Sequence, residues 1–533
     1  MKRLSVAIFV VLAAAPLLAQ SPKVSLASLI EAGNRKAALD RIRAGADVNE
    51  AQPDGTRPIH WAVYRVDYEL LGALIARKAN LNVRNEFGST PIAQAAELAD
   101  ATMVKMLLDA GAEREGANPD GQTALMLAIK VGATPVVDML IKAGAKVNTI
   151  EKFHNQTPLM WAATAPKNAG EMVKLLLAKG ADVKSRALYT DWPSQITSEP
   201  RAQYRPVGGL TALLYSARDG CYDCVEALIG AGADVNVPTP EGVTALLLAL
   251  DNDHNEVAKL LLDRGASPHL WDWWGRTALY IAVDRKATLG ASRGGRGGAA
   301  TVTRRGSSPV VSSMDIIKAL LAADVDLNPQ LNFHRPSRGG NSGRFIDPLL
   351  NTGCTPLLRA TMAGDAEVVR ALLDKGADPN INAMGLTSFL VAAGVGAGNR
   401  GGTGLAAQTS AGGPVNMELM ELLLQHGADV NAQVTGTLTY SMRVSRAPSA
   451  NEGKTALHVA AESGKTDLVR YLLGKGASTL ITDADGKKPI ELVSSTGRSG
   501  NAPAAAGTPA GGGANPASGA EIRSLLENAA SRR

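Results

Sequence analysis

At 533 residues the chain is too long for one ordinary domain, so we expect either several domains or an array of repeats. Apolar residues make up 45% of the sequence and aromatic residues only 4%. With 55 Gly and 27 Pro, this composition favours many short helices joined by turns and argues against a β-sandwich. The formal net charge of +5 is too small to indicate a nucleic-acid partner.

The N-terminus has the pattern of a secretory signal peptide. Lys2 and Arg3 form a charged start, residues 4–18 are predominantly apolar, and Ala19 supplies a small residue at a cleavage position. The apolar run is too short to span a bilayer comfortably and no stop-transfer segment follows it, so we expect no membrane span. We predict a signal peptide at 1–19 and a periplasmic or secreted protein after cleavage near Ala19. The alternative is a buried N-terminal helix.

Two short strings recur along the chain in one phase. The first reads Gly-Ala-Asp-Val-Asn in its fullest copies, at 45–49, 232–236 and 427–431, and copies beginning at residues 45, 78, 111 and 144 are 33 residues apart. The second string starts with Thr followed by Pro or Ala. It leads the units at Thr90, Thr123, Thr157, Thr244, Thr277, Thr355 and Thr455.

These strings predict the two ends of a helix pair. A Thr hydroxyl caps an open backbone N–H, and Pro fits the first helical position because its missing donor costs nothing there. The apolar positions within 368–373 repeat with a helical period, and Gly376 then ends that helix because Gly adopts the left-handed conformation cheaply. Arg57 and Lys488 stand where Thr is expected, which weakens those two helix starts.

The two linked strings resemble the ankyrin repeat, whose period and leading Thr-Pro-Leu-His-x-Ala string are the same. With the signal peptide, the chain resembles an exported bacterial protein of this type with loop insertions. The resemblance implies an all-α solenoid of about twelve helix–turn–helix units with short β-hairpin loops, and a binding surface made of hairpin tips and first helices on the concave face. We predict an N-terminal capping repeat at 20–52, repeats at 53–283 and 284–495, and a C-terminal capping helix at 519–533.

Six insertions interrupt the period after the fourth unit. Three are predicted to lie in the projecting hairpins, at 185–207, 330–353 and 433–452. Three are predicted to lie between the two helices of a unit, at 286–313, 394–414 and 496–518. The last is a low-complexity tract of Ala, Gly and Pro, a composition that cannot form a core.

Half of the chain's six tryptophans lie within four consecutive positions of one hairpin, where the family's register points side chains outward. Because tryptophan is enriched at binding hot spots, we predict that this hairpin contacts a partner, assisted by polar groups on nearby first helices. The alternative is that the indoles pack on the adjacent insertion or on the next hairpin. One further anchor comes from the insertion at 185–207. The predicted partner-binding residues are Trp271, Trp273, Trp274, Arg276, Tyr280, Asp251, Asp284 and Trp192.

Cys221 and Cys224 form the one motif with a catalytic appearance. A Cys-x-x-Cys pair at a helix N-terminus can be redox-active because the helix dipole lowers the thiol pKa. However, no thioredoxin-like strand precedes the pair, and Cys224 falls on the buried stripe of a second helix. The sequence leaves two structural alternatives open, a local disulfide and two packed thiols.

No metal-ligand set, Walker loop, dinucleotide fingerprint or catalytic-triad spacing stands out. We therefore predict a monomeric, non-enzymatic scaffold or adaptor that binds another protein and uses no cofactor and no metal. Two alternatives remain: a redox-active protein using Cys221 and Cys224, and an electrostatic binder of anionic envelope components. The latter would use arginine-bearing insertions such as 287–313, which has four arginines and no carboxylate.

Overall fold

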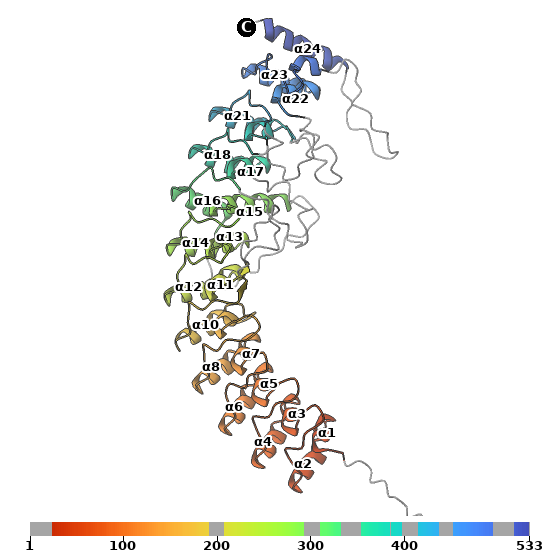
Figure 1. Ribbon diagram of the computed structural model, residues 1–533, viewed down its shortest axis with the longest axis vertical. Helices are drawn as coiled ribbons and strands as arrows, with labels where there is room; N and C mark the ends of the chain where they lie inside the picture. Colours follow the sequence, from red (N-terminus) through yellow and green to blue (C-terminus); the bar gives the residue numbers. More distant parts are fainter. Residues whose placement is uncertain are drawn as a thin grey trace, which may run out of the picture. The chain divides into compact units, whose positions relative to one another are not determined.

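The computed structural model describes residues 24–190, 207–292, 310–331, 353–383, 385–396, 414–435, 451–493 and 516–531. Within these ranges the chain forms twelve successive helix pairs, which confirms the predicted all-α repeat fold (Figure 1). The predicted signal peptide lies outside the described residues, as do Trp192 and the four arginines of the insertion at 287–313.

The first helices of the pairs are α1 (Leu26–Glu31), α3 (Pro58–Tyr64), α5 (Pro91–Glu97), α7 (Ala124–Lys130), α9 (Pro158–Ala163), α11 (Ala212–Asp219), α13 (Ala245–Asp251), α15 (Ala278–Ser292), α17 (Pro356–Met362), α19 (Ser388–Ala392), α22 (Ala456–Glu462) and the 3₁₀ turn η2 (Pro489–Leu492). The second helices are α2 (Arg35–Arg43), α4 (Tyr68–Ala76), α6 (Ala101–Asp109), α8 (Thr134–Lys142), α10 (Ala169–Leu177), α12 (Tyr222–Gly230), α14 (Asn255–Asp263), α16 (Ser313–Ala322), α18 (Ala366–Asp374), α21 (Met417–Gln425), α23 (Thr466–Gly474) and α24 (Pro516–Ser531).

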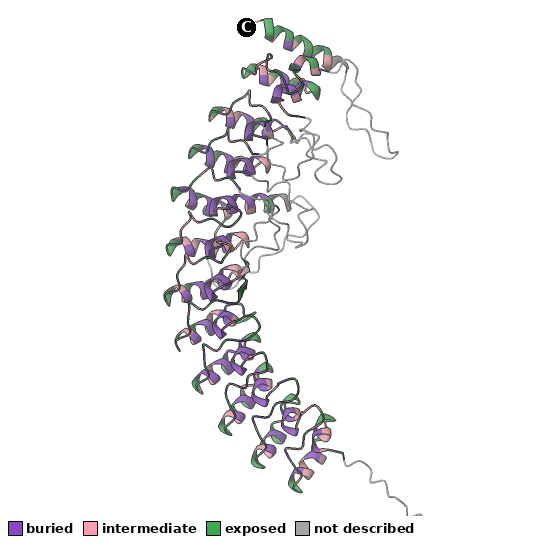
Figure 2. Ribbon diagram, viewed as in Figure 1, coloured by how far each residue is buried: buried purple, intermediate pink, exposed green. Residues whose placement is uncertain are grey.

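Contacts divide the chain into two compact units. The N-terminal unit ends at Phe153 and includes Pro166–Asn168, and the C-terminal unit contains His154–Ala165 and the chain from Ala169 onward. In the N-terminal unit α3 packs against α1 and α5, and in the C-terminal unit α13 packs against α11 and α15. The buried residues of each pair face its neighbours in the stack (Figure 2). Each unit is therefore held together by stacking, because one helix pair cannot bury its own apolar face.

The predicted threonine helix starts are confirmed. The Met126 N–H donates to Thr123 Oγ1 at 3.3 Å, and the Tyr280 N–H donates to Thr277 Oγ1 at 3.2 Å. The same capping bond is made by Thr90, Thr157, Thr211, Thr244, Thr355, Thr387 and Thr455. At the two departures the N–H of the N-cap residue donates to a side chain three residues on: the Arg57 N–H donates to His60 Nδ1, and the Lys488 N–H donates to Glu491 Oε2.

Asparagines of the first repeated string link one repeat to the next. The Asn82 side-chain oxygen accepts the Glu113 N–H at 2.8 Å, and the Asn380 side-chain oxygen accepts the Asp429 N–H at 2.8 Å. We call this series of bonds the asparagine ladder. Its other rungs join Asn49 to Asn80, Asn236 to Ser267, Asn328 to Asp378 and Asn431 to Ser478, with Glu115 serving the same role toward Lys146.

The hairpins between pairs are tight turns. Regular strand pairing in the described residues is confined to β1 (Tyr189–Thr190) and β2 (Val207–Gly208), which are antiparallel. Neighbouring tips are joined by backbone bonds: the Glu86 N–H donates to Asp54 O, and the Trp273 N–H donates to Glu241 O, each at 2.8 Å. These bonds hold each tip on a rigid base.

Two predicted boundaries differ from the structure. The insertion expected to begin at 286 begins later, because α15 continues as a helix to Ser292. The last helix begins at Pro516, three residues before the predicted 519. In the first case Lys286 reaches forward to the Asp365 carboxylate at the start of α18, so the extra helical length has a partner in the next repeat.

The buried histidines of the leading string predict a pH-dependent stability. Burial lowers the pKa of His60 and of His458, and each ring Nε2 donates to a backbone oxygen of the next repeat, of Ser89 and of Lys487. Just below the ordinary histidine pKa of about 6.5, the unfolded chain therefore binds more protons than the folded one. Stability should be complete above that pH and fall as the pH drops through it.

Urea unfolding midpoints measured across this window check the prediction. The double variant His60→Gln/His458→Gln should show a smaller dependence of its midpoint on pH, even if its midpoint is lower throughout. An equal pH slope in the variant and the wild type would show that these two rings are not the cause.

Candidate functional site

The tryptophan hairpin projects from the C-terminal unit between α14 and α15. The Gly275 N–H donates to Asp272 O at 2.8 Å, and Trp271 pairs with Thr277 in an antiparallel bridge, so the turn is tightly closed. Trp271 is 62% exposed and Trp273 is 45% exposed. The prediction that these two side chains point outward is confirmed.

The same prediction is wrong for Trp274. Its side chain is 8% exposed, and the Arg276 guanidinium lies over its ring at 5.2 Å from the centroid. The backbone N–H of Trp274 also donates to Asp272 Oδ1 at 3.0 Å. Trp274 therefore belongs to the base of the hairpin, where it packs under a cation.

Arg276 and Asp251 are not free polar contacts as predicted, because they pair with each other. The buried Arg276 guanidinium lies 2.7 Å from the Asp272 carboxylate and 3.3 Å from that of Asp251. Burial alone would lower the pKa of Arg276, but the two carboxylates raise it above its usual value. We call Asp251, Asp272 and Arg276 the hairpin triad, and its role is to fix the tip.

Tyr280 and Asp284 are also buried, so the prediction that they are available to a partner is wrong. Asp284 Oδ1 accepts from Arg359 Nε at 2.6 Å, a bond between α15 and α17. Tyr280 packs with Cys354 in an apolar cluster that includes Leu331 and Leu358. Burial raises the pKa of Tyr280 well above its ordinary value and raises the pKa of the Cys354 thiol to about 12, so both stay neutral.

A cleft of about 500 Å³ opens beside Trp271. One wall comes from the tryptophan hairpin and the other from the loop after α16. Its lining residues are Pro268, His269, Trp271, Gly275, Thr277, Val325, Asp326, Pro329 and Gln330. Its volume is in the range of ligand pockets, which run from roughly 300 to 1,000 Å³. Sequence reasoning missed this cleft because its two walls, which end and begin at Thr277 and Val325, are far apart in the chain.

Two further exposed aromatic side chains at hairpin tips were not predicted. Phe87 is 70% exposed and Phe153 is 71% exposed, both in the N-terminal unit. Phe87 stands directly before the turn glycine, at the position that Trp274 occupies in its own hairpin. This position before the turn glycine is the sequence feature that could have indicated Phe87.

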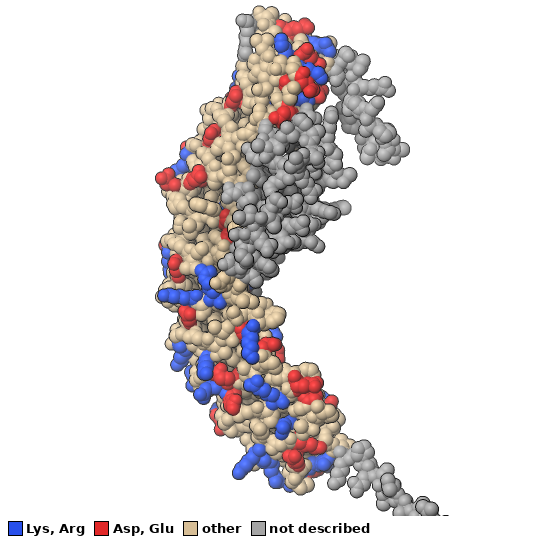
Figure 3. Space-filling view, in the orientation of Figure 1, with Lys and Arg blue, Asp and Glu red and all other residues tan. Residues whose placement is uncertain are grey.

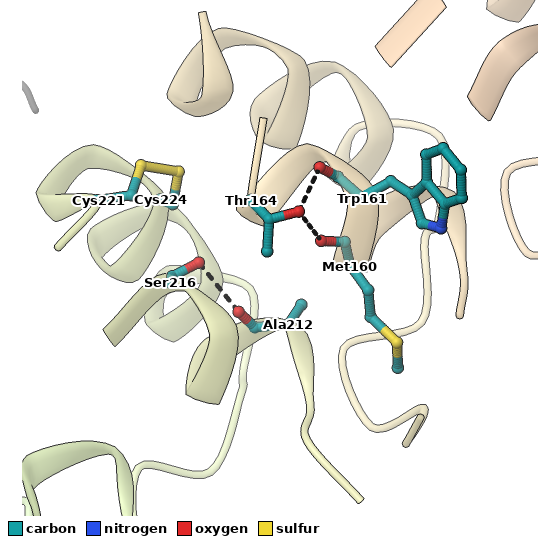
Figure 4. The surroundings of a disulfide bond; sticks show 7 residues. All are labelled: Met160, Trp161, Thr164, Ala212, Ser216, Cys221 and Cys224. Carbon is teal, nitrogen blue, oxygen red and sulfur yellow. Dashed lines mark hydrogen bonds between the residues drawn. A yellow bond between two sulfur atoms is a disulfide. The ribbon is translucent and has the colours of Figure 1, made fainter. Parts of the chain in front are cut away.

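Cys221 and Cys224 are joined by a disulfide at the start of α12 (Figure 4). Both residues are buried, and they lie beside Ser216 of α11. Cys221 is the N-cap of α12 and makes no side-chain capping bond, so the disulfide ties the N-cap to the third helical residue in place of that bond. The burial of both sulfurs favours a structural role over redox exchange with a partner.

Charge and metal-ligand geometry give no second site in the described ranges. Lys, Arg, Asp and Glu are interspersed over the visible face of the N-terminal unit (Figure 3). No three His, Cys, Asp or Glu side chains of the described residues are grouped as metal ligands. Among those residues, no helix combines the length and the hydropathy that a membrane span requires.

Comparison with protein families gives a consistent match along the chain. A family model described as "Ankyrin repeats (3 copies)" matches residues 114–187, 213–289 and 385–483, and the single "Ankyrin repeat" model matches 352–383. Together these stretches cover more than half of the chain.

Relatives match over shorter stretches. The chain is 34% identical over 178 residues to a mitochondrial disaggregase of Homo sapiens, covering 33% of this chain and 23% of that protein. It is 35% identical over 98 residues to the human ankyrin repeat and SOCS box protein 16, covering 18% and 22%. It is 29% identical over 168 residues to an L-asparaginase of Dirofilaria immitis, covering 31% and 26%. The chain thus spans about a quarter of the length of each of these relatives.

Proposed function

This chain belongs to the ankyrin-repeat family, and on that premise we propose that it is a non-enzymatic adaptor that binds another protein through the tryptophan hairpin and the cleft beside it. Ankyrin repeats are generally protein-interaction modules. In a fold shared by many proteins, function depends on the side chains displayed at particular sites.

The observation that carries the proposal is the exposure of Trp271 and Trp273 on a fixed turn. Exposed tryptophan side chains on a fixed turn are among those enriched as anchors at interfaces. The hairpin triad and the buried Trp274 hold the turn, so little conformational entropy is lost when a partner docks.

Changing both exposed tryptophans to Ala should abolish capture of the partner and leave stability unchanged. Each central Trp should contribute about 2 kcal/mol or more to binding. We would identify partners by affinity capture from cell-envelope extract with the wild-type protein, then measure their affinity for wild type and for Trp271→Ala/Trp273→Ala. Phe153→Ala, an equally exposed tip in the other unit, is the matched control.

Two outcomes would contradict this proposal. A variant that melts several degrees lower would show that the indoles pack on protein. A variant that melts normally and binds every partner as the wild type does would place the binding surface elsewhere on the array.

We also propose that the protein is exported and acts outside the cytoplasm. The charged start, the apolar run and the small residue at Ala19 support cleavage there. The Cys221–Cys224 disulfide is independent support, because disulfides persist mainly in oxidising compartments. N-terminal sequencing of the purified protein should find a start near Gln20 in the periplasm or the medium. Recovery of soluble cytoplasmic protein that begins at Met1 would refute export.

A further inference from the structure

We propose that the cleft beside Trp271 takes the side chain of an arginine carried on an extended segment of the partner protein. This inference rests on the proposed function and names the chemistry that the tryptophan hairpin recognises. It follows from three features of the described residues: a missing rung of the asparagine ladder, the composition of the cleft walls, and the charge of its lining.

The cleft lies where the asparagine ladder is interrupted. In the copy of the first string at 265–269, His269 takes the place of Asn, whereas Asn236 and Asn328 occupy that place in the repeats on either side. Both of these asparagines accept a backbone N–H from the next repeat. The Asp326 N–H makes no equivalent bond to the side chain of His269, and both of these residues are described by the structure. The cleft lies between the two loops at the position of this missing bond.

The missing rung leaves a backbone donor at the cleft wall. In seven other repeats a side-chain amide or carboxylate oxygen accepts this N–H. A carbonyl oxygen of an extended peptide can satisfy the Asp326 N–H in the same way, which is the main-chain hydrogen bonding that extended peptides use in docking. This geometry favours an extended peptide over a compact surface as the occupant.

The walls suit a cationic side chain with a long apolar stem. Trp271 offers an exposed aromatic ring, and Pro268 and Pro329 are apolar. Among the described residues of the lining, Asp326 is the carboxylate and none is Lys or Arg. One Asp326 oxygen accepts the Asn328 N–H at 2.9 Å, and the carboxylate is otherwise exposed to an incoming donor.

Arginine fits this set better than lysine. A planar guanidinium stacks on an indole and also forms parallel hydrogen bonds to a carboxylate, whereas an ammonium acts as a point charge. Within this same hairpin the chain already uses that arrangement, since Arg276 stacks on Trp274 and pairs with Asp272. The partner's arginine would repeat the arrangement on the outside of the hairpin.

Binding of labelled peptide pools to the full chain tests the proposal. One pool has a fixed central Arg with randomised flanks, and two matched pools carry citrulline or Lys at that position. By fluorescence anisotropy the wild type should bind the Arg pool about tenfold more tightly than the citrulline pool, with Lys between them, since citrulline keeps the shape and removes the charge. Trp271→Ala and Asp326→Asn should each abolish this preference. His269→Asn, which restores the ladder residue, should weaken binding of the Arg pool.

Phe87→Ala is the matched control, because Phe87 is an exposed aromatic side chain at another hairpin tip and does not line the cleft. This variant should keep the preference for Arg. Equal binding of the Arg and citrulline pools by the wild type would overturn the proposal, as would an unchanged preference in Asp326→Asn. Binding that appears only after deletion of residues 293–309 would also overturn it, by showing that the chain's own arginine-bearing segment is the occupant.

The result separates the inference from the proposed function. If captured partners still depend on Trp271 while the peptide pools are not distinguished, the adaptor function stands and the arginine chemistry is wrong. If Trp271→Ala changes neither partner capture nor peptide binding, both are wrong.

Discussion

Replacing Arg276 with Ala should lower the free energy of unfolding by about 3–5 kcal/mol, the usual cost of leaving a buried charge without its partner. Arg276 pairs with two carboxylates, and that of Asp272 is completely buried. Removal of the guanidinium leaves Asp272 with its backbone donors and no cation. It also removes the group that lies over the Trp274 ring.

Chemical denaturation followed by tryptophan fluorescence measures this loss. The matched control is Arg264→Ala, which breaks an exposed pair with Glu226 at 3.2 Å and should cost at most about 1 kcal/mol. Because a repeat array unfolds through nearest-neighbour interactions, the transition assigned to the C-terminal unit should shift more than the one assigned to the N-terminal unit. A loss for Arg276→Ala no larger than the control's would show that water reaches the triad.

The helix pairs could be predicted from the sequence because the interactions that define them are local. A threonine hydroxyl such as that of Thr123 bonds a backbone N–H three residues away, and Gly45 and Gly376 adopt φ of 85° and 95° at helix ends. Each of these features is complete within one repeat. The sequence of one repeat is therefore enough to predict its two helices, and the recurrence every 33 residues supports that prediction.

The burial of Asp284 could not be predicted, because its partner lies in another repeat. Asp284 pairs with Arg359, which is 75 residues away across two insertions. Arg276 likewise reaches back to Asp251, in addition to Asp272 of its own hairpin. The prediction from the repeat register considers each repeat alone, so it placed the charged side chains of Asp284 and Arg276 on the surface. The same argument was correct for Trp271 and Trp273, whose side chains are exposed.

The cleft could be predicted from the sequence only in part. The exchange of Asn for His269 is visible in the sequence, but its meaning depends on what the asparagines do, and the structure supplies that. Once the ladder is known, the residue at this position indicates whether a rung can form. Glu115 keeps its rung through a carboxylate oxygen, whereas Lys184, in the copy of the string at 180–184, has a side chain that cannot accept a hydrogen bond.

Replacing Asp284 with Ala should also cost about 3–5 kcal/mol, and a compensating change should recover most of that loss. The single change leaves the buried Arg359 guanidinium without its carboxylate, which accepts at 2.6 Å. No neighbouring group can ionise to replace it, because burial raises the pKa of the Cys354 thiol to about 12 and raises that of Tyr280 well above its ordinary value.

The double variant Asp284→Leu/Arg359→Met removes both charges and keeps the volume filled with apolar atoms. It should lie within about 1–2 kcal/mol of the wild type, since a buried ion pair replaced by packed apolar side chains is often close to neutral. Urea unfolding of the wild type, of Asp284→Leu, of Arg359→Met and of the double variant gives the coupling energy directly. If the double variant loses as much as the sum of the two singles, the pair contributes no coupling, and the stability of α15 against α17 comes from the apolar cluster around Tyr280 alone.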